Sequence, residues 1–157
     1  MHGTMNVHSF GGSVPKLNPY GVSMKFANWR HSARQSVLVV DDDECLRYLL
    51  ASTLELESFD VQIAGGGKDA IETVRKKQEK NENFDIILLD IMMPDVDGWE
   101  VLKYVKSNAP STKVIMLTAF YDTKSVVEAM RLGASDFLTK PLDIRDILAS
   151  IVRVTAM

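Results

Sequence analysis

Residues 86–98 of the chain read IILLDIMMPDVDG. The first four residues would be apolar on both faces of an extended chain, and so short a run, followed by Pro and Gly, predicts a buried parallel strand. Asp90 then lies at the carboxyl end of that strand, the edge at which open α/β sheets collect their ligands. A carboxylate at this place serves as a metal ligand, as a nucleophile, or only as the cap of a turn.

The same alternation of short apolar runs and helical spacing extends over most of the chain. Strands are expected at residues 37–40, 61–64, 86–89, 114–117 and 136–139. Apolar residues at helical spacing follow each run, from Leu46, Ala70, Trp99, Val126 and Ile144. The fourth of these helices is marked by Val126, Val127 and Met130 and should end at Gly133. Strict β-α alternation predicts right-handed crossovers and a parallel sheet with helices on both faces.

The polarity of the runs also predicts the order of the strands. The runs at 37–40, 86–89 and 114–117 are apolar throughout and belong in the middle of the sheet, whereas the mixed runs at 61–64 and 136–139 suit its edges. The order 2-1-3-4-5 meets this requirement. Its switch point lies between the first and third strands, where a ligand crevice is expected.

Charge divides the chain into two parts. Residues 1–35 contain four basic residues and no acidic one; because the whole chain carries −3, residues 36–157 carry −7. We expect residues 1–35 to be a flexible basic extension, either a linker or vector-derived, with a strand-like alternation from Tyr20 to Phe26 that allows partial order. Residues 36–157 should form one compact domain.

Composition excludes several classes of function for residues 36–157. All three histidines precede residue 36, so histidine-based acid–base catalysis and His-ligated zinc are excluded there. A domain at −7 is a poor ligand for nucleic acid, so no direct nucleic acid binding by this segment is expected. No apolar run is long enough to span a membrane, and the single cysteine, Cys45, fits a reducing compartment. A cytoplasmic location is therefore expected.

Polar residues follow four of the predicted strands. Asp41 and Asp42 end the first strand, Asp90 the third, Thr118 the fourth and Lys140 the fifth. In a parallel sheet these ends meet at one edge, where several carboxylates would repel one another. A divalent cation relieves that repulsion, and hard oxygen ligands favour Mg²⁺, with Mn²⁺ as the substitute. The cation and Lys140 would neutralise an incoming phosphoryl group, and the Thr118 hydroxyl could donate a hydrogen bond to it.

Four segments together carry a family resemblance: VVDDDE at 39–44, LLDIMMPDVDG at 88–98, MLTA at 116–119 and GASDFLTKP at 133–141. In this order and on these elements they resemble the receiver domain of two-component response regulators. The resemblance covers about residues 36–154. It implies a flavodoxin-like doubly wound (βα)5 sandwich with a five-stranded parallel sheet.

The resemblance also implies roles for individual residues. Asp90 would be the phosphoacceptor, and Mg²⁺ would be bound by Asp42, Asp90 and the main-chain carbonyl of Met92, with Asp41 contributing through water. Thr118 and Lys140 would hold the phosphoryl oxygens.

Two further implications concern the residues around this site. Phe137 falls at the family's aromatic switch position, where it would act together with Thr118, but it lacks the hydroxyl that a tyrosine would offer. Lys140-Pro141 falls at the family's usual cis peptide.

Two apolar residues lie close in sequence to the expected phosphoacceptor and to Thr118. Met92 follows Asp90 by two positions and Phe120 follows Thr118 by two, and both side chains are apolar. The resemblance places them along the route of the water that hydrolyses the acyl phosphate. We hypothesise that the pair tunes the site by screening it from water, which lengthens the life of the phosphorylated state.

The function implied by these features is a phosphoacceptor signalling switch. It would take a phosphoryl group from a sensor histidine kinase or a histidine phosphotransfer protein and catalyse its own phosphorylation and dephosphorylation, without being an enzyme in the ordinary sense. The alternatives are an aspartate-nucleophile phosphatase, although Met92 cannot supply its second acid, and a phosphorylation-independent interaction domain. By resemblance, the fourth helix, fifth strand and fifth helix would form a homodimer contact. We expect the chain to have been cut from a longer regulator, with a stand-alone receiver as the other option.

Overall fold

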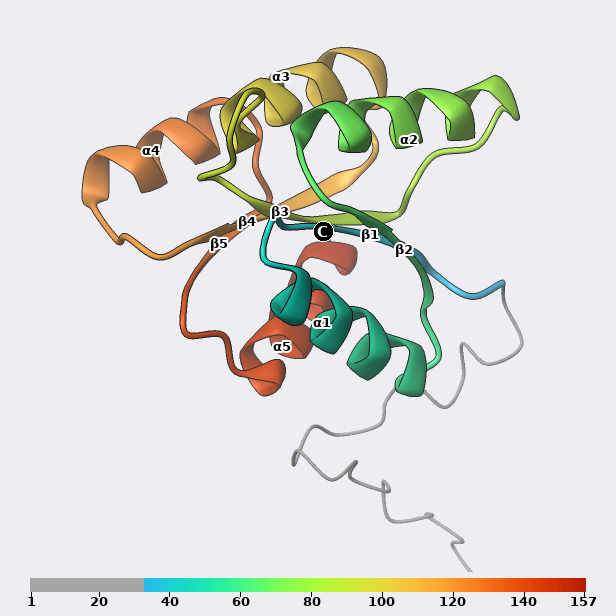
Figure 1. The fold of residues 1–157 in the computed structure, drawn as a ribbon, viewed down its shortest axis with the longest axis horizontal. Coiled ribbons are helices and arrows are strands. Elements are labelled where there is room, and N and C mark those ends of the chain that lie inside the picture. Colours follow the sequence, from blue (N-terminus) through green and yellow to red (C-terminus); the bar gives the residue numbers. More distant parts are fainter. Residues whose placement is uncertain (1–32) are drawn as a thin grey trace, which may run out of the picture.

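A computed structural model of the chain describes residues 33–157, and in this range five strands alternate with five helices (Figure 1). The elements are β1 (Ser36–Val40), α1 (Glu44–Leu56), β2 (Asp60–Ala64), α2 (Gly67–Glu79), β3 (Ile86–Asp90), α3 (Gly98–Asn108), β4 (Lys113–Thr118), α4 (Thr123–Arg131), β5 (Asp136–Thr139) and α5 (Ile144–Thr155). The longest helices, α1 and α2, have 13 residues, and no helix in the described range has the length and apolar character that crossing a membrane requires. The expectations for the N-terminal extension up to residue 32 lie outside the described residues.

The five strands form one parallel sheet in the order β2-β1-β3-β4-β5. This confirms the predicted flavodoxin-like order, with the two mixed strands at the edges. Val40 of β1 pairs with Leu89 of β3, and Asp90 pairs with Leu117 of β4. The carboxyl ends of the central strands therefore lie side by side at one edge of the sheet.

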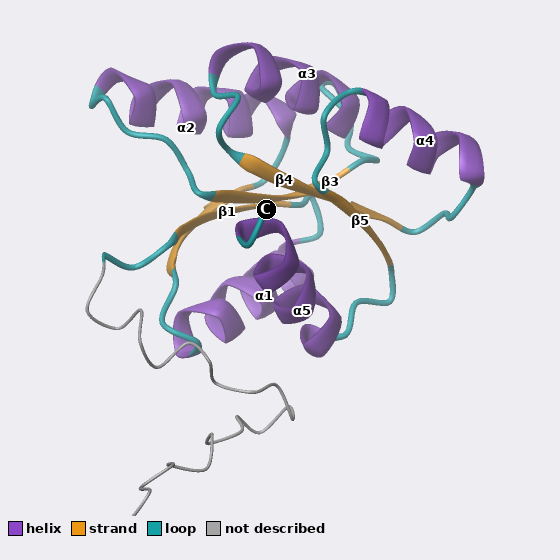
Figure 2. Cartoon of the chain, turned by 180° about the vertical axis from the view of Figure 1, so that it is seen from behind, coloured by secondary structure: helices purple, strands orange, loops and turns teal. Residues whose placement is uncertain are grey.

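Helices cover both faces of the sheet: α1 and α5 lie on one face, and α2, α3 and α4 lie on the other (Figures 1 and 2). Alternate residues of each central strand face opposite layers. In β3, Ile86 and Leu88 pack with α1 and α5, whereas Ile87 and Leu89 pack with the other three helices. All four side chains are fully buried, and each contributes about 2 kcal/mol to stability by leaving water. Burial on both faces is why these strands are apolar throughout.

Aspartates begin four of the five helices. Asp43, Asp97, Asp122 and Asp143 each precede a helix, and each side chain accepts a hydrogen bond from a backbone N–H two or three residues later. Such caps satisfy amides that have no partner inside the helix, and each is worth about 1 kcal/mol. They start the helices close to the strand ends and keep three of the loops at the sheet's carboxyl edge short.

The fourth helix differs from the prediction in the face it buries. Val127 and Met130 marked the helix in the sequence, but both side chains are exposed, and Ala129 is the residue buried in the core. With nine residues at the end of its layer, α4 buries only a narrow stripe against the core. Gly133 follows the helix with φ +97°, the left-handed conformation of a helix stop, as predicted.

Candidate functional site

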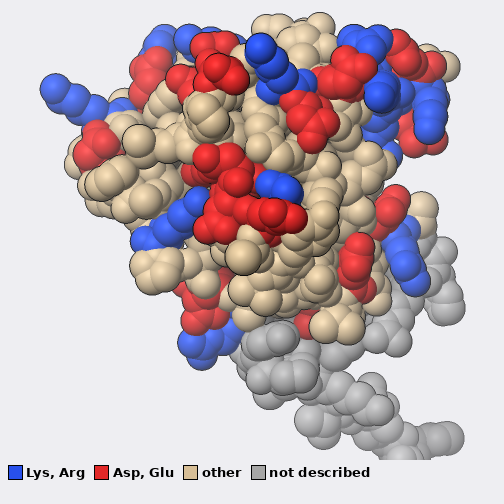
Figure 3. Space-filling model, viewed as in Figure 1, with Lys and Arg blue, Asp and Glu red and all other residues tan. Residues whose placement is uncertain are grey.

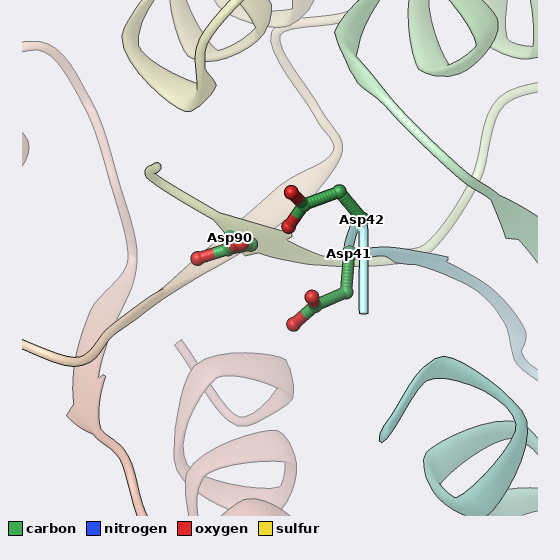
Figure 4. A group of neighbouring side chains, drawn as sticks. All are labelled: Asp41, Asp42 and Asp90. Atoms are coloured by element: carbon green, nitrogen blue, oxygen red, sulfur yellow. The ribbon is translucent and has the colours of Figure 1, made fainter. Parts of the chain in front are cut away.

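Three carboxylates meet at the carboxyl edge of the sheet. Asp41 and Asp42 follow β1, Asp90 is the last residue of the neighbouring strand β3, and one oxygen of each lies within 4.8 Å of the others (Figure 4). Asp41 and Asp90 are buried, with exposed fractions of 0% and 4%, whereas Asp42 is open to solvent. The structure thus brings together the three acids that the sequence placed at this edge.

The third aspartate of the run has a different task. The Asp43 side chain caps α1 by accepting a hydrogen bond from the Leu46 N–H at 3.1 Å, so it does not join the cluster. The Asp43 N–H in turn donates to Oδ1 of Asp41 at 2.9 Å. The first turn of α1 therefore helps to hold the buried carboxylate of Asp41.

Lys140, immediately after β5, is the cation of the site. Its Nζ lies 2.8 Å from Oδ2 of Asp41 and 3.5 Å from Oδ1 of Asp90. Burial alone would lower the pKa of Lys140, but the hydrogen bond and charge of Asp41, with the charge of Asp90, outweigh it and raise that pKa. Lys140 is therefore charged at neutral pH. The Lys140-Pro141 peptide is cis, which confirms the expectation from the sequence.

One lysine does not neutralise three acids. Burial raises the pKa of Asp90 to about 6, the charges of Asp41 and Asp42 push it in the same direction, and Lys140 opposes them. On the surface, acidic side chains also gather at the centre of the face shown in Figure 3, with a basic side chain beside them. At neutral pH the site holds more negative charge than its own residues can offset.

The donor atoms of the cluster fit a magnesium ion. Carboxylate oxygens are the ligands that Mg²⁺ prefers, and Asp41, Asp42 and Asp90 supply them at one edge of the sheet. One exposed carboxylate, that of Asp42, leaves a side open to water or to a phosphoryl oxygen. Within residues 33–157 this is the one group of three or more acidic, histidine or cysteine side chains close enough to share an ion.

Thr118 ends β4 next to Asp90 but has other partners. Its hydroxyl donates to the Phe120 carbonyl and accepts from the Phe120 N–H, both at 3.1 Å. The side chain is therefore held by its own loop, a local turn that threonine commonly makes. To donate a hydrogen bond to a group on Asp90, the hydroxyl must give up its bond to the Phe120 carbonyl.

The remaining predicted residues lie around this edge. Phe137 in β5 is half-buried against the core beneath α2, α3 and α4. Met92 and Phe120 expose 59% and 65% of their surface, so both are available for contact with water or a partner. Ala119, beside Thr118, is also exposed.

Sequence reasoning missed the role of Gly98 at the start of α3. A Cβ on Gly98 would lie 2.3 Å from the Asp90 carbonyl oxygen and 2.6 Å from Cα of Ile91. The Gly98 N–H donates to the Ile91 carbonyl at 2.8 Å, so the helix begins directly against the end of β3 that carries Asp90. A glycine after Asp97, the helix-capping residue, was the available signal, but the sequence does not reveal which backbone lies against it.

With this geometry in view, comparison with known proteins identifies the class. The family model for the response regulator receiver domain matches residues 37–152. The chain belongs to the response regulator receiver domain family, which confirms the resemblance seen in its motifs. Receiver domains bind Mg²⁺ through acidic residues, and this chain places Asp41, Asp42 and Asp90 together.

Individual curated proteins similar to this chain are also regulators of this kind. The transcriptional regulatory protein CpxR homolog of Haemophilus influenzae is 43% identical over 117 residues, which are 73% of this chain and 48% of that protein. The response regulator protein PilR of Pseudomonas aeruginosa is 35% identical over 125 residues, 78% of this chain and 27% of that protein. The chain thus spans half or less of these curated relatives.

Solved structures share the fold over nearly their whole length. A CheY-like response regulator receiver domain protein from Methanospirillum hungatei JF-1 has a TM-score of 0.71 at 29% identity, covering 79% of this chain and 96% of that one. The CheX-CheY-BeF3-Mg²⁺ complex from Borrelia burgdorferi gives 0.72 at 30% identity, covering 77% and 89%.

Proposed function

We propose that this chain is the phosphoacceptor switch of a two-component phosphorelay and that Asp90 receives the phosphoryl group in a Mg²⁺-dependent reaction. The observation that carries the proposal is the meeting of three carboxylates and Lys140 at one edge of the sheet, with Asp90 in contact range of all of them. Membership of the receiver family supports it. The receiver would comprise residues 36–157.

Asp90 is the nucleophile in this proposal. One of its carboxylate oxygens attacks the phosphorus of a phosphohistidine; the O–P bond forms as the N–P bond breaks, and the imidazole leaves with the bonding electron pair and takes a proton from solvent. Because the pKa of Asp90 is about 6, the carboxylate is mostly ionised at neutral pH and able to attack. Asp42, Asp90 and the Met92 carbonyl would hold the metal, with Asp41 acting through water.

The neighbouring groups compensate the charge of the transferred group. Bound Mg²⁺ supplies positive charge that offsets both the carboxylates and the phosphoryl oxygens. Lys140 already pairs with Asp41 and Asp90, and there it would pair with an oxygen of a phosphoryl group on Asp90. Hydrolysis of the acyl phosphate reverses the change, with Met92 and Phe120 limiting the access of water.

Thr118 and Phe137 would convert phosphorylation into a change of shape. A phosphoryl oxygen on Asp90 offers the Thr118 hydroxyl a charged partner in place of the neutral Phe120 carbonyl that it now contacts. Moving the hydroxyl releases the loop between β4 and α4. Phe137 is half-buried on the adjacent strand and would repack as that loop moves.

The partners follow from the same chemistry. A sensor histidine kinase or a histidine phosphotransfer protein would donate the phosphoryl group, as receiver domains interact with such proteins.

A homodimer through α4, β5 and α5 forms a further part of the proposal. Val127 and Met130 expose apolar surface on α4, whereas Glu128 is paired with Arg131 and Asp136 with Arg153 inside the domain.

Phosphorylation by a small donor tests the proposal. The protein is incubated with acetyl phosphate, with Mg²⁺ or with EDTA, and the acyl phosphate is followed by intact-protein mass spectrometry. We expect an adduct with Mg²⁺ only, and none in Asp90→Asn. Asp95→Asn is the matched control, because Asp95 lies in the same loop at φ +65°, which asparagine tolerates, and should leave the adduct unchanged.

The same assay separates the competing functions. A lasting, metal-dependent adduct on Asp90 supports the switch. Continuous release of phosphate without an adduct would instead indicate a phosphatase with an aspartate nucleophile. Absence of both adduct and turnover would indicate an interaction domain that works without phosphorylation.

A further inference from the structure

Arg47, in the first turn of α1, reaches back to the loop that carries the acids. Its guanidinium Nη1 donates a hydrogen bond to the main-chain carbonyl of Asp41 at 2.8 Å. That carbonyl belongs to the peptide unit that joins Asp41 to Asp42. The contact therefore fixes the plane of the peptide from which the Asp42 side chain departs.

The guanidinium is confined from its other side by the loop after β2. A Cβ on Gly65 would lie 3.3 Å from Nη1 and 3.5 Å from Cζ of Arg47, so a glycine leaves the room that the arginine occupies. The residue before it, Ala64, accepts a hydrogen bond from the Asp41 N–H at 3.3 Å. Arg47 thus lies between the loops that follow β1 and β2.

One donor of Arg47 is left without a partner among residues 33–157 in this placement. Its Nε is buried and has no hydrogen-bond partner in the described part of the chain. A buried donor without a partner costs free energy, and a guanidinium on a helix surface would normally turn toward solvent to avoid it. The guanidinium instead keeps its hydrogen bond to the Asp41 carbonyl and lies over the Tyr48 ring, 5.6 Å from its centre.

Asp42 is the acid that needs such support. Asp41 is held by Lys140 and by the Asp43 N–H, and Asp90 is held within β3. Asp42 is the exposed member of the cluster, so no surrounding packing holds its carboxylate, and its direction follows from its main chain and from its contact with Asp90.

We propose that Arg47 is a positioning residue that orients the Asp41–Asp42 peptide so that the Asp42 carboxylate faces Asp90 across the metal site. The proposal deepens the proposed function and rests on it, because the ion in question is the Mg²⁺ of the phosphoacceptor site. Residues that orient metal ligands are typically worth 10- to 100-fold in metal affinity.

Removing the charge of Arg47 tests the proposal, because electrostatics and positioning predict opposite changes in the affinity for Mg²⁺. Arg47→Met deletes a positive charge that contacts the Asp41 main chain, and by Coulomb's law alone this loss would tighten the binding of a cation at the nearby acids. If Arg47 positions Asp42, the same substitution weakens Mg²⁺ binding, by about 10-fold or more. Arg47→Lys keeps the charge and part of the reach, and should restore part of the affinity.

The measurement is the dissociation constant of Mg²⁺ by isothermal titration calorimetry on the full chain without a phosphodonor. Arg75→Met is the matched control, since Arg75 lies on the exposed face of α2 with Glu72 and Glu79 as its partners, and it should bind Mg²⁺ like the wild type. With acetyl phosphate, Arg47→Met should need about 10-fold more Mg²⁺ for half-maximal rate. Its rate at saturating Mg²⁺ should stay within about twofold of the wild type, because Asp90 and Lys140 are untouched.

The outcomes are distinct. Mg²⁺ binding by Arg47→Met that equals or exceeds that of the wild type overturns the positioning role while leaving the phosphoacceptor function intact. A wild type that binds no Mg²⁺ overturns both. If Arg47→Met does not fold, Gly65→Val decides. Even a Cβ would lie 3.3 Å from Nη1, so the larger side chain displaces the guanidinium: weakened binding supports the role and wild-type binding overturns it.

Discussion

The two ends of the sheet carry similar polar residues, but these residues pair with one another completely at one end and incompletely at the other. At the amino edge, Ser36 and Asp85 form a closed set: the Ser36 N–H and hydroxyl donate to Asp85 at 2.8 and 3.1 Å, and the Asp85 N–H donates back to the Ser36 hydroxyl at 3.1 Å. At the carboxyl edge, three carboxylates lie together, and Lys140 pairs with only two of them, Asp41 and Asp90. The polar groups of the amino edge therefore complete one another's hydrogen bonds, whereas the charges of the carboxyl edge are not balanced by its own residues.

This difference separates the stabilising edge from the functional one. Polar groups that complete one another's hydrogen bonds lock the strands and leave nothing for a ligand to add. Carboxylates that outnumber the neighbouring cations raise the free energy of the metal-free folded state. A bound cation would lower that free energy again. The comparison therefore predicts that substitutions at the two edges respond differently to Mg²⁺.

Loss of Lys140 should have the largest effect. Lys140→Met leaves Asp41 and Asp90 buried without their cation, and breaking a buried pair in this way typically costs about 3 kcal/mol. We expect that loss in urea unfolding with EDTA, and recovery of most of it in saturating Mg²⁺. Lys124→Met on exposed α4 serves as the control and should change little. Equal losses with and without Mg²⁺ would contradict the account.

Removal of the charge of Asp90 should stabilise the metal-free protein. The pKa of Asp90 is about 6 when folded against 3.8 for an ordinary aspartate, so between these values the folded state holds the extra proton. The stability contributed by this group is present below pH 3.8 and is lost as pH rises through 6, by up to about 3 kcal/mol. In EDTA at neutral pH, Asp90→Asn should thus unfold at a higher urea concentration than the wild type.

The difference between the two proteins should shrink as the pH is lowered toward 4, because the wild-type carboxyl then regains its proton. A denaturation series across this range tests the sign. An Asp90→Asn protein that is less stable than the wild type at neutral pH without metal would show that the site is not under electrostatic strain.

At the amino edge the effect should be smaller and independent of metal. Asp85→Ala removes the acceptor for two hydrogen bonds of Ser36 and should lower the free energy of unfolding by about 1 kcal/mol. The loss should be the same with Mg²⁺ and with EDTA, and acetyl phosphate should label the variant as it labels the wild type. A loss of stability that Mg²⁺ reverses would contradict the claim that only the carboxyl edge responds to the metal.

The smallest change is expected at Met92 and appears only in kinetics. If Met92 and Phe120 screen the acyl phosphate from water, Met92→Asn should speed the loss of phosphate by a few-fold, less than about 1 kcal/mol in activation free energy. Decay of the phosphorylated protein after removal of the donor measures it, with Met130→Asn as the control on exposed α4. An unchanged decay rate in Met92→Asn would reject the screening hypothesis.

Much of the fold and the acidic cluster could be predicted from the sequence because both follow from burial and topology. A strand covered by helices on both faces must be apolar throughout, as β1, β3 and β4 are. Once the sheet is parallel, residues that end neighbouring strands meet. The convergence of Asp41, Asp42, Asp90 and Lys140 was therefore foreseeable without coordinates.

Other features depend on contacts that no local pattern encodes. The Thr118 hydroxyl could have faced Asp90 or its own loop, and the structure shows the loop. Arg47 looks like a solvated residue on α1 until the Asp41 carbonyl and Gly65 are placed beside it. Val127 had the spacing of a core residue, but α4 turns it toward solvent.

The most direct test of the central claim is a crystal structure of the protein with Mg²⁺ and beryllofluoride, a stable mimic of the phosphoryl group. We expect Mg²⁺ on Asp42, Asp90 and the Met92 carbonyl, beryllofluoride on Asp90, Lys140 shifted from Asp41 to a fluorine, and the Thr118 hydroxyl released from Phe120. Beryllofluoride absent from Asp90, or Mg²⁺ bound away from the three carboxylates, would contradict the account.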